Sequence, residues 1–208
     1  MKWFQLPLGS LQTNCYVLAN SKKECLIFDP GGDAGKLFDF ISGKGLEPKA
    51  VLLTHAHFDH IGALDDIRQE YGIQAYIHEK ETDWLIDPAL NGSKFFMGGA
   101  MRMNPAENVV KGDQKMTVKG FDFELIETPG HSPGSVSYYF KEAGAVFSGD
   151  ALFRRSIGRT DLPGGNHKQL IQSIKNKLLK LPNSTVVLSG HGDATTIREE
   201  TRENPFLT

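Results

Sequence analysis

Three histidines and one aspartate lie within six consecutive positions of this chain, at His55, His57, Asp59 and His60. The apolar run 50–53 leads directly into them and is typical of a buried β-strand. In an extended segment, residues two apart point to the same side, so His55 and His57 can share one cation. Asp59 and His60 follow where we expect the chain to turn into a helix, and they can point to a second spot nearby. Imidazole and carboxylate groups are ligands for zinc, iron and manganese, so the motif predicts a metal centre rather than a metal-free histidine-rich loop.

Length and charge set the broad class. The 208 residues, with a formal net charge of −2, fit one domain spanning 1–208. Without a basic run, an acidic tail or a long apolar stretch, we expect neither a nucleic acid nor a membrane as partner. The first five residues contain no apolar signal region, so a cytoplasmic location is the default expectation. Cys15 and Cys25 lie in apolar runs, and we expect them to be small buried residues rather than a redox pair or metal ligands.

Hydrophobic periodicity predicts a mixed order of strands and helices. Short apolar runs predict strands at 3–8, 15–19, 25–29, 50–54, 74–77, 115–118, 121–128, 135–140, 145–148 and 185–189. Helical spacing of apolar residues predicts helices at 62–71 and 168–181 and a helix over 33–43 that Asp33 can cap and that Gly43 and Gly45 end. A short polar helix is expected near 196–202. Two strand-rich halves with interspersed helices suggest two sheets packed face to face with helices outside.

The pattern loosens over residues 79–110. A helical turn is expected near 81–86, and the stretch 95–103 is rich in Phe, Met and Gly. Such a long apolar connection is unusual inside a compact domain. One interpretation is a lid or pocket wall over the metal site, and the alternative is a loop packed on the core or used in a subunit contact.

Three later stretches end apolar runs in glycine-rich turns that carry His131, Asp150 and His191. Loops at strand ends are where a rigid scaffold presents chemical groups. Glycine beside such a residue permits backbone angles and close approaches that other residues do not. With the first motif, these stretches bring the number of potential ligands to seven.

The order of these motifs, over essentially the whole chain, resembles the metallo-β-lactamase superfamily. The stretches Asp-Pro-Gly-Gly at 29–32, Thr-Pro-Gly-His-Ser at 128–132 and Gly-Arg-Thr-Asp at 158–161 resemble its glyoxalase II branch, most closely the short single-domain bacterial members. The resemblance implies an α/β (α+β) fold, a four-layer αββα sandwich with the site along one edge of the sheets. Longer glyoxalase II enzymes carry a C-terminal helical domain that helps to hold glutathione, and we expect no such domain here, because little sequence follows His191.

The resemblance also implies how the ligands divide between two divalent metal ions, expected to be zinc, with iron or manganese as alternatives. The first ion falls on His55, His57 and His131, the second falls on Asp59, His60 and His191, and Asp150 bridges them. Two such ions would lie about 3.5–4 Å apart.

The expected activity is hydrolysis of a small-molecule thioester such as S-lactoylglutathione. Metal ions lower the pKa of bound water from about 15.7 to about 7, so a bridging hydroxide can attack the thioester carbonyl. Asp59 is a ligand and also a possible acceptor of the hydroxide's proton.

Arg159 is either a contact for a substrate carboxylate or an ion-pair partner of Asp161. Asp29 either supports the site or only ends a strand. For His78 we favour a structural or rim role, and for His167 a capping or loop-bracing role.

Other functions remain open. A persulfide dioxygenase shares the resemblance but uses one iron, and lactonases and phosphodiesterases use related chemistry. A non-catalytic module, in which the ions only stabilise the fold, is a further alternative. The sequence indicates no oligomeric state, acyl group or carrier thiol.

Overall fold

The computed structural model describes residues 1–207, so Thr208, the last residue of the predicted domain, lies outside the described residues. The chain divides into two compact units, the first covering residues 1–110 and the second beginning at Lys111. Each unit contains one six-stranded sheet. The expectation of one domain over 1–208 stays a prediction.

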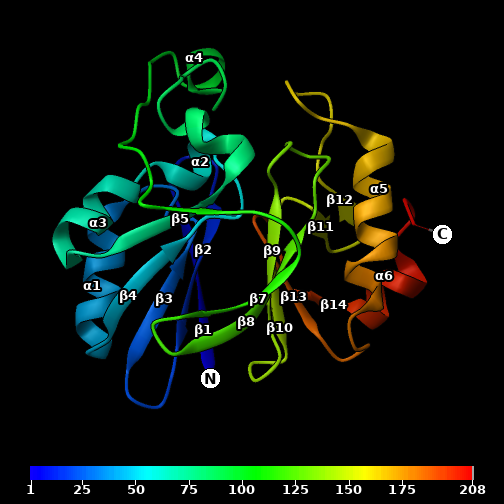
Figure 1. The fold of residues 1–208 in the computed structure, drawn as a ribbon, viewed down its shortest axis with the longest axis horizontal. Helices are drawn as coiled ribbons and strands as arrows, with labels where there is room; N and C mark the ends of the chain where they lie inside the picture. Colours follow the sequence, from blue (N-terminus) through cyan, green and yellow to red (C-terminus); the bar gives the residue numbers. More distant parts are fainter. Residues whose placement is uncertain (208) are drawn as a thin grey trace. The chain divides into compact units, whose positions relative to one another are not determined.

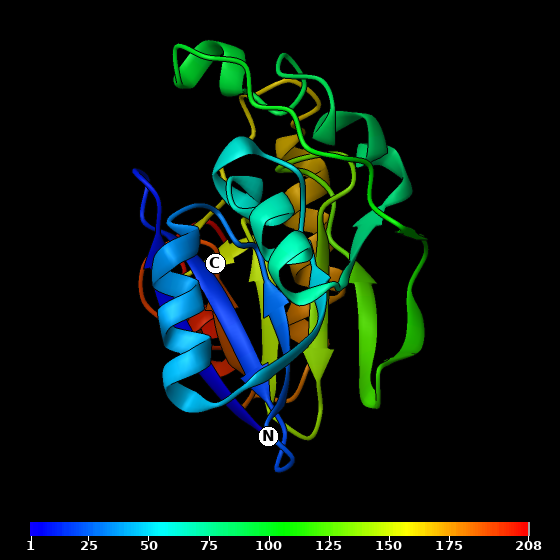
Figure 2. The ribbon, with the colours of Figure 1, turned by 90° about the vertical axis from the view of Figure 1, so that its left-hand side faces the viewer.

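The first unit is a mixed sheet with helices. Its elements are β1 (Lys2–Leu8), β2 (Thr13–Ala19), β3 (Glu24–Phe28), α1 (Ala34–Lys44), β4 (Glu47–Leu52), α2 (Phe58–Ile61), α3 (Leu64–Tyr71), β5 (Gln74–His78), the 3-10 helix η1 (Glu79–Leu85), α4 (Ser93–Phe96) and β6 (Asn108–Val110). The strands follow the order β1-β2-β3-β4-β5-β6, antiparallel up to β3 and parallel from there on. Figure 2 shows α1 and α3 lying over one face of this sheet.

Apolar residues at helical spacing attach these helices to the sheet. Leu37 and Ile41 of α1 and Leu64 and Ile67 of α3 are fully or almost fully buried in one core with β-strand residues such as Val51. Burying an aliphatic side chain of this size contributes roughly 1.5–3 kcal/mol. The predicted amphipathic faces at 33–43 and 62–71 are therefore the faces that pack.

The second unit repeats this construction. Its elements are β7 (Gln114–Val118), β8 (Phe121–Glu127), β9 (Val136–Phe140), β10 (Ala145–Gly149), β11 (Leu152–Phe153), β12 (Ser156–Ile157), α5 (His167–Asn176), the 3-10 helix η2 (Leu178–Lys180), β13 (Val186–Ser189), β14 (Thr195–Thr196) and α6 (Ile197–Glu203). The sheet order is β14-β13-β10-β9-β8-β7, and β11 pairs with β12. Figure 1 shows α5 and α6 on the same side of this sheet, and their buried residues Leu170, Ile174 and Ile197 share a core with Val146 and Val187.

The ends of the strands decide where loops emerge. In the first unit, β3 and β4 are parallel neighbours, so the residues that follow them, Asp29 and His55, leave the sheet at the same edge. In the second unit, β10 is parallel to β13, and β8 has the same direction because two antiparallel pairings separate it from β10. The loops that carry His131, Asp150 and His191 therefore emerge at one edge of that sheet.

Three local expectations were wrong. Asp59 and His60 lie inside the short helix α2, and a separate helix begins only at Leu64. Gly62 separates the two helices, and a side chain there would overlap the carbonyl oxygen of Gly31. Asp33 precedes α1 but its side chain does not cap it; its carboxylate instead accepts hydrogen bonds from the Gly9 amide and Lys36.

The helix predicted at 168–181 is interrupted. Lys177, with backbone angles outside the helical region, ends α5 and precedes η2. Its ammonium group donates hydrogen bonds to Asp113 and to the carbonyl of Glu127. None of the helices that the described residues form is long and apolar enough to span a bilayer.

Candidate metal centre

The histidine motif forms a dense, buried cluster at the end of β4. His55, His57 and His60 are 1%, 6% and 0% exposed, so these rings belong to the interior. The ring centroids of His55 lie 4.8 Å from His57 and 4.0 Å from His60. His60 Nε2 lies 3.6 Å from Asp59 Oδ2, too far for a hydrogen bond.

One buried carboxylate fixes the orientation of two of these rings. Asp29 accepts hydrogen bonds from the backbone amide of Thr54 at 2.8 Å and from its hydroxyl at 2.6 Å, and its Oδ2 lies 3.0 Å from His60 Nδ1. An ionised carboxylate only accepts, so His60 Nδ1 carries the proton. The Thr54 hydroxyl, having donated to Asp29, can only accept from His55 Nδ1, 3.1 Å away. Asp29 therefore leaves the Nε2 lone pairs of both histidines as the ligand positions.

The backbone of Asp29 explains how it reaches these groups. Its φ is 47°, in the left-handed region that aspartate tolerates better than most residues. The chain turns sharply at the end of β3, and the carboxylate points back to the neighbouring β4 loop. Of the two interpretations of Asp29, the structure supports a role in the site.

Two further residues hold the motif and were not predicted. Thr13 donates its hydroxyl hydrogen to Asp59 Oδ2 at 2.7 Å, and Glu81, fully buried, accepts from the amide of Ala56 at 2.7 Å. Thr13 is the first residue of β2 but stands in a polar stretch of the sequence, and Glu81 stands in a segment without a motif, so no sequence signal marked either. Both contacts bridge residues far apart in the chain.

The second unit holds its three residues in a similar way. His131 Nδ1 lies 2.8 Å from the carbonyl oxygen of Arg159, which only accepts, so Nε2 is again the ligand atom. Asp150 Oδ2 lies 3.6 Å from His131 Nε2 and 3.6 Å from His191 Nε2. Two ligand atoms on a tetrahedral ion with bonds of about 2.1 Å would be roughly 3.4 Å apart. The spacing fits a shared ion on each side of Asp150 better than it fits hydrogen bonds.

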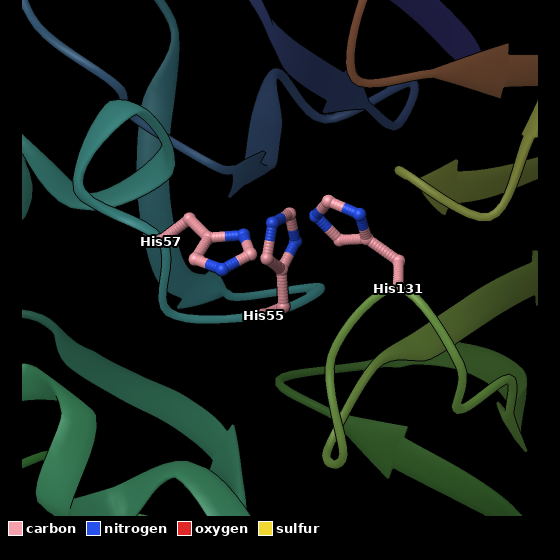
Figure 3. A group of neighbouring side chains, drawn as sticks. All are labelled: His55, His57 and His131. Carbon is pink, nitrogen blue, oxygen red and sulfur yellow. The ribbon is translucent and has the colours of Figure 1, made fainter. Parts of the chain in front are cut away.

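Three groups of donors have ligand atoms within 4.8 Å of one another. They are His55, His57 and His131; His55, His60 and Asp150; and Asp59, His60 and His191. Figure 3 shows the first group, in which His55 and His57 come from one loop and His131 from another. Nitrogen and oxygen donors with fixed tautomers fit zinc, iron or manganese.

Close backbone contacts support both aspartates. A side chain at Gly31 would overlap the carbonyl oxygen of Asp59, and one at Gly158 would overlap that of Asp150. Glycine is therefore required at these positions for the loops to approach.

The remaining sequence candidates have other roles in the structure. Arg159 pairs with Asp161 through two hydrogen bonds of 2.8 and 2.7 Å, which lower the pKa of Asp161 to about 2. Because Asp161 stays ionised above that pH, the pair persists through the neutral range, in line with the ion-pair interpretation. His78 Nδ1 accepts from Lys80 at the start of η1, a structural role. Asn166, not His167, caps α5.

The two cysteines are buried, as expected. Burial raises the pKa of the Cys25 thiol to about 12 and raises that of Cys15 well above its usual value. Neither thiol is therefore available as a thiolate nucleophile at neutral pH.

Residues 8–191 match the metallo-β-lactamase superfamily. This chain belongs to that superfamily. The predicted membership and the mixed α/β metallo-β-lactamase fold are confirmed. Among relatives, a probable metallo-hydrolase of Bacillus subtilis is 52% identical, with 100% of this chain and 98% of that protein covered. A hydroxyacylglutathione hydrolase of Haemophilus influenzae is 35% identical, with 97% and 96% covered.

Two solved structures are also similar to this superfamily member. A B3 metallo-β-lactamase, BLEG-1, is 53% identical with a TM-score of 0.98, and the match covers 100% of both chains. The protein TTHA1623, solved in a di-iron-bound form, is 40% identical with a TM-score of 0.86, covering 98% of this chain and 100% of the other.

Replacing Asp29 by alanine is expected to lower metal affinity by about 10- to 100-fold, because His55 and His60 lose the group that fixes their tautomers. Asp33→Ala is the matched control: Asp33 has the same φ of 47° but an exposed carboxylate. The metal affinity of both variants is measured by competition with a chromogenic chelator. An equal loss of affinity in both would assign the effect to backbone strain and contradict the role of Asp29.

Proposed function

We propose that this chain is a metal-dependent hydrolase with two metal ions that cleaves a small-molecule thioester, such as S-lactoylglutathione. The observation that carries the proposal is that seven histidine and aspartate residues form three overlapping groups, each of which could hold a metal ion. The similarity to a hydroxyacylglutathione hydrolase supports the substrate class.

The division between two ions follows the family resemblance, and two of the three donor groups match it. One ion takes His55, His57 and His131, and the other takes Asp59, His60 and His191. Asp150 bridges them, in keeping with its equal 3.6 Å spacing to His131 and His191. Zinc fits this donor set, and the di-iron form of a similar protein makes iron the main alternative.

When bound, such ions make hydroxide available near neutral pH and polarise a carbonyl oxygen. The chain's own residues keep this chemistry in place. Asp29 and the Arg159 carbonyl hold the tautomers of three histidines, so their Nε2 lone pairs stay available. Asp59, whose Oδ2 already accepts a hydrogen bond from Thr13, is the group proposed to accept a proton from the attacking water. No serine or cysteine nucleophile is required, and the raised pKa values of the two cysteines agree with this.

Arg159 as a contact for a substrate carboxylate stays a prediction. Its guanidinium is more than half exposed and already paired with Asp161. A substrate anion would have to compete with that carboxylate. A free contact of this kind is therefore the weaker of the two roles considered for Arg159.

A second candidate is the opening of a β-lactam ring, favoured by the similarity to a B3 metallo-β-lactamase. The same centre would attack a strained amide in place of a thioester. Three assays on one sample separate these functions. They use S-lactoylglutathione, a chromogenic cephalosporin, and a persulfide with oxygen uptake measured by an electrode. Our proposal expects hydrolysis of the thioester at the highest kcat/KM and no oxygen uptake. Preferred cephalosporin cleavage, or oxygen uptake with one iron per chain, would overturn it.

A further inference from the structure

A cavity of about 200 Å³ in the first unit borders the proposed metal ligand Asp59. Its side-chain walls come from three separate segments: the β1–β2 turn, α2 and the loop that follows α4. The apolar residues among them are Leu8, Leu11, Phe58, Met97 and Met101. Glycines line much of the remainder, and Ser10 is the polar residue besides Asp59.

The loop that closes this cavity is anchored at its base and apolar at its tip. Asn91, fully buried, donates to the carbonyl oxygens of Trp84 and Met101 and accepts from the amide of Ser93. Its own carbonyl oxygen accepts from the amide of Phe58, so the anchor is tied to the histidine motif. Both ends of the segment 91–101 are therefore fixed.

The tip of the same segment exposes large apolar side chains. Phe95, Phe96 and Met97 are 63%, 54% and 49% exposed, and Phe96 stacks on Phe58 with ring centroids 6.1 Å apart. Figures 1 and 2 show α4 protruding from the end of the first unit at which α2 lies. Leu11, which also lines the cavity, is 52% exposed. Met and Phe side chains form an adaptable apolar surface, and a surface of this kind can bind an apolar ligand.

The size and charge of the cavity restrict what it can hold. Taking the ~30 Å³ that a water molecule occupies, it has room for roughly six methylene-sized groups. Apart from the proposed metal ligand Asp59, its described lining residues carry no charged side chain, so an anionic group would find no cationic partner among them. The carboxylates of a thiol carrier would therefore be disfavoured there, whereas a neutral apolar chain would be favoured.

We propose that this cavity is the subsite for the acyl chain of the substrate, and that it selects apolar acyl groups of about six carbons over the short, polar lactoyl group. This inference rests on the proposed thioester hydrolysis and adds its acyl specificity. In this proposal Met97 and Met101 of the segment 91–101 form part of the subsite wall, in line with the pocket-wall interpretation, while Met101 also packs against the apolar core of the first unit.

The test uses two series of N-acetylcysteamine derivatives. In S-acyl thioesters from acetyl to octanoyl, kcat/KM is expected to rise about fourfold for each added methylene up to about hexanoyl and then to level off. In the matched S-alkyl thioethers, which cannot be hydrolysed, affinity measured by calorimetry is expected to rise in the same way. The double variant Leu11→Ser, Met97→Ser should flatten both series, since it removes apolar wall from two half-exposed positions. Met116→Ser, in β7 of the other unit, is the control that should leave both unchanged.

The two readouts separate this inference from the function on which it rests. Length-dependent thioether binding without thioester cleavage would support the subsite and contradict the hydrolase. Thioester cleavage that does not depend on chain length would contradict the subsite and leave the hydrolase. Thioether affinity that does not change with chain length would overturn the inference whatever the activity.

Discussion

Replacing Asp150 by alanine is expected to lower thioester hydrolysis by about a thousandfold or more, and to lower the metal content of the purified protein. Asp150 Oδ2 is equally spaced, at 3.6 Å, from His131 Nε2 and His191 Nε2, so one carboxylate serves both proposed ions. Losing it removes several kcal/mol of charge stabilisation, and each 1.36 kcal/mol corresponds to about a tenfold change in rate. Hydrolysis assays and metal analysis of the same preparation measure the effect.

Asp193→Ala is the matched control, because Asp193 is an acidic residue close in sequence to His191 but lies 80% exposed in a surface ion pair with Arg154. Surface ion pairs of this kind contribute little to stability. The control should retain metal and activity. Normal metal content with full activity in Asp150→Ala would refute the bridging role.

Replacing Gly158 by alanine is expected to destabilise the protein by about 3 kcal/mol, which corresponds to a fall in Tm of roughly 10 °C for a chain of this size. The new methyl group would overlap the carbonyl oxygen of Asp150 and lie 3.3 Å from His131 Cβ. Backbone must move to relieve this overlap, because neither neighbour is the end of a flexible side chain. Asp150 would move with it, so metal content measured below the unfolding temperature should also fall.

Gly43→Ala tests the same substitution where there is space. Gly43 lies in α1 with nothing within 4 Å of the added methyl group. Alanine in a helix is more stable than glycine by roughly 0.5–1 kcal/mol, so this variant should raise Tm slightly. A Gly158→Ala protein with unchanged Tm and metal content would contradict the predicted overlap, because the loop would then accommodate the added methyl group without moving.

Most of the fold could be predicted from the sequence because its apolar pattern is strongly periodic. The strands around Val51 and Val146 and the helix faces carrying Leu37 and Leu170 pack as predicted. The candidate ligands could also be picked out from the sequence, because each follows an apolar strand and the end of a strand determines where its loop emerges.

What could not be predicted depends on contacts between distant residues. The bond from Asp29 to His60 spans 31 positions, that from Thr13 to Asp59 spans 46, and that from Glu81 to Ala56 spans 25. Local propensity contains no information about such pairs. The short helix α2 was missed as well, and the close approach of Gly62 to Gly31, at the break between α2 and α3, is again a contact between distant residues.

The most direct test of the central claim measures metal stoichiometry and S-lactoylglutathione hydrolysis on one sample, before chelation, after chelation and after metal is restored. We expect about two ions per chain, loss of activity on chelation while the protein stays folded, and recovery in proportion to the metal returned. Undiminished hydrolysis by the folded, metal-free protein would contradict it.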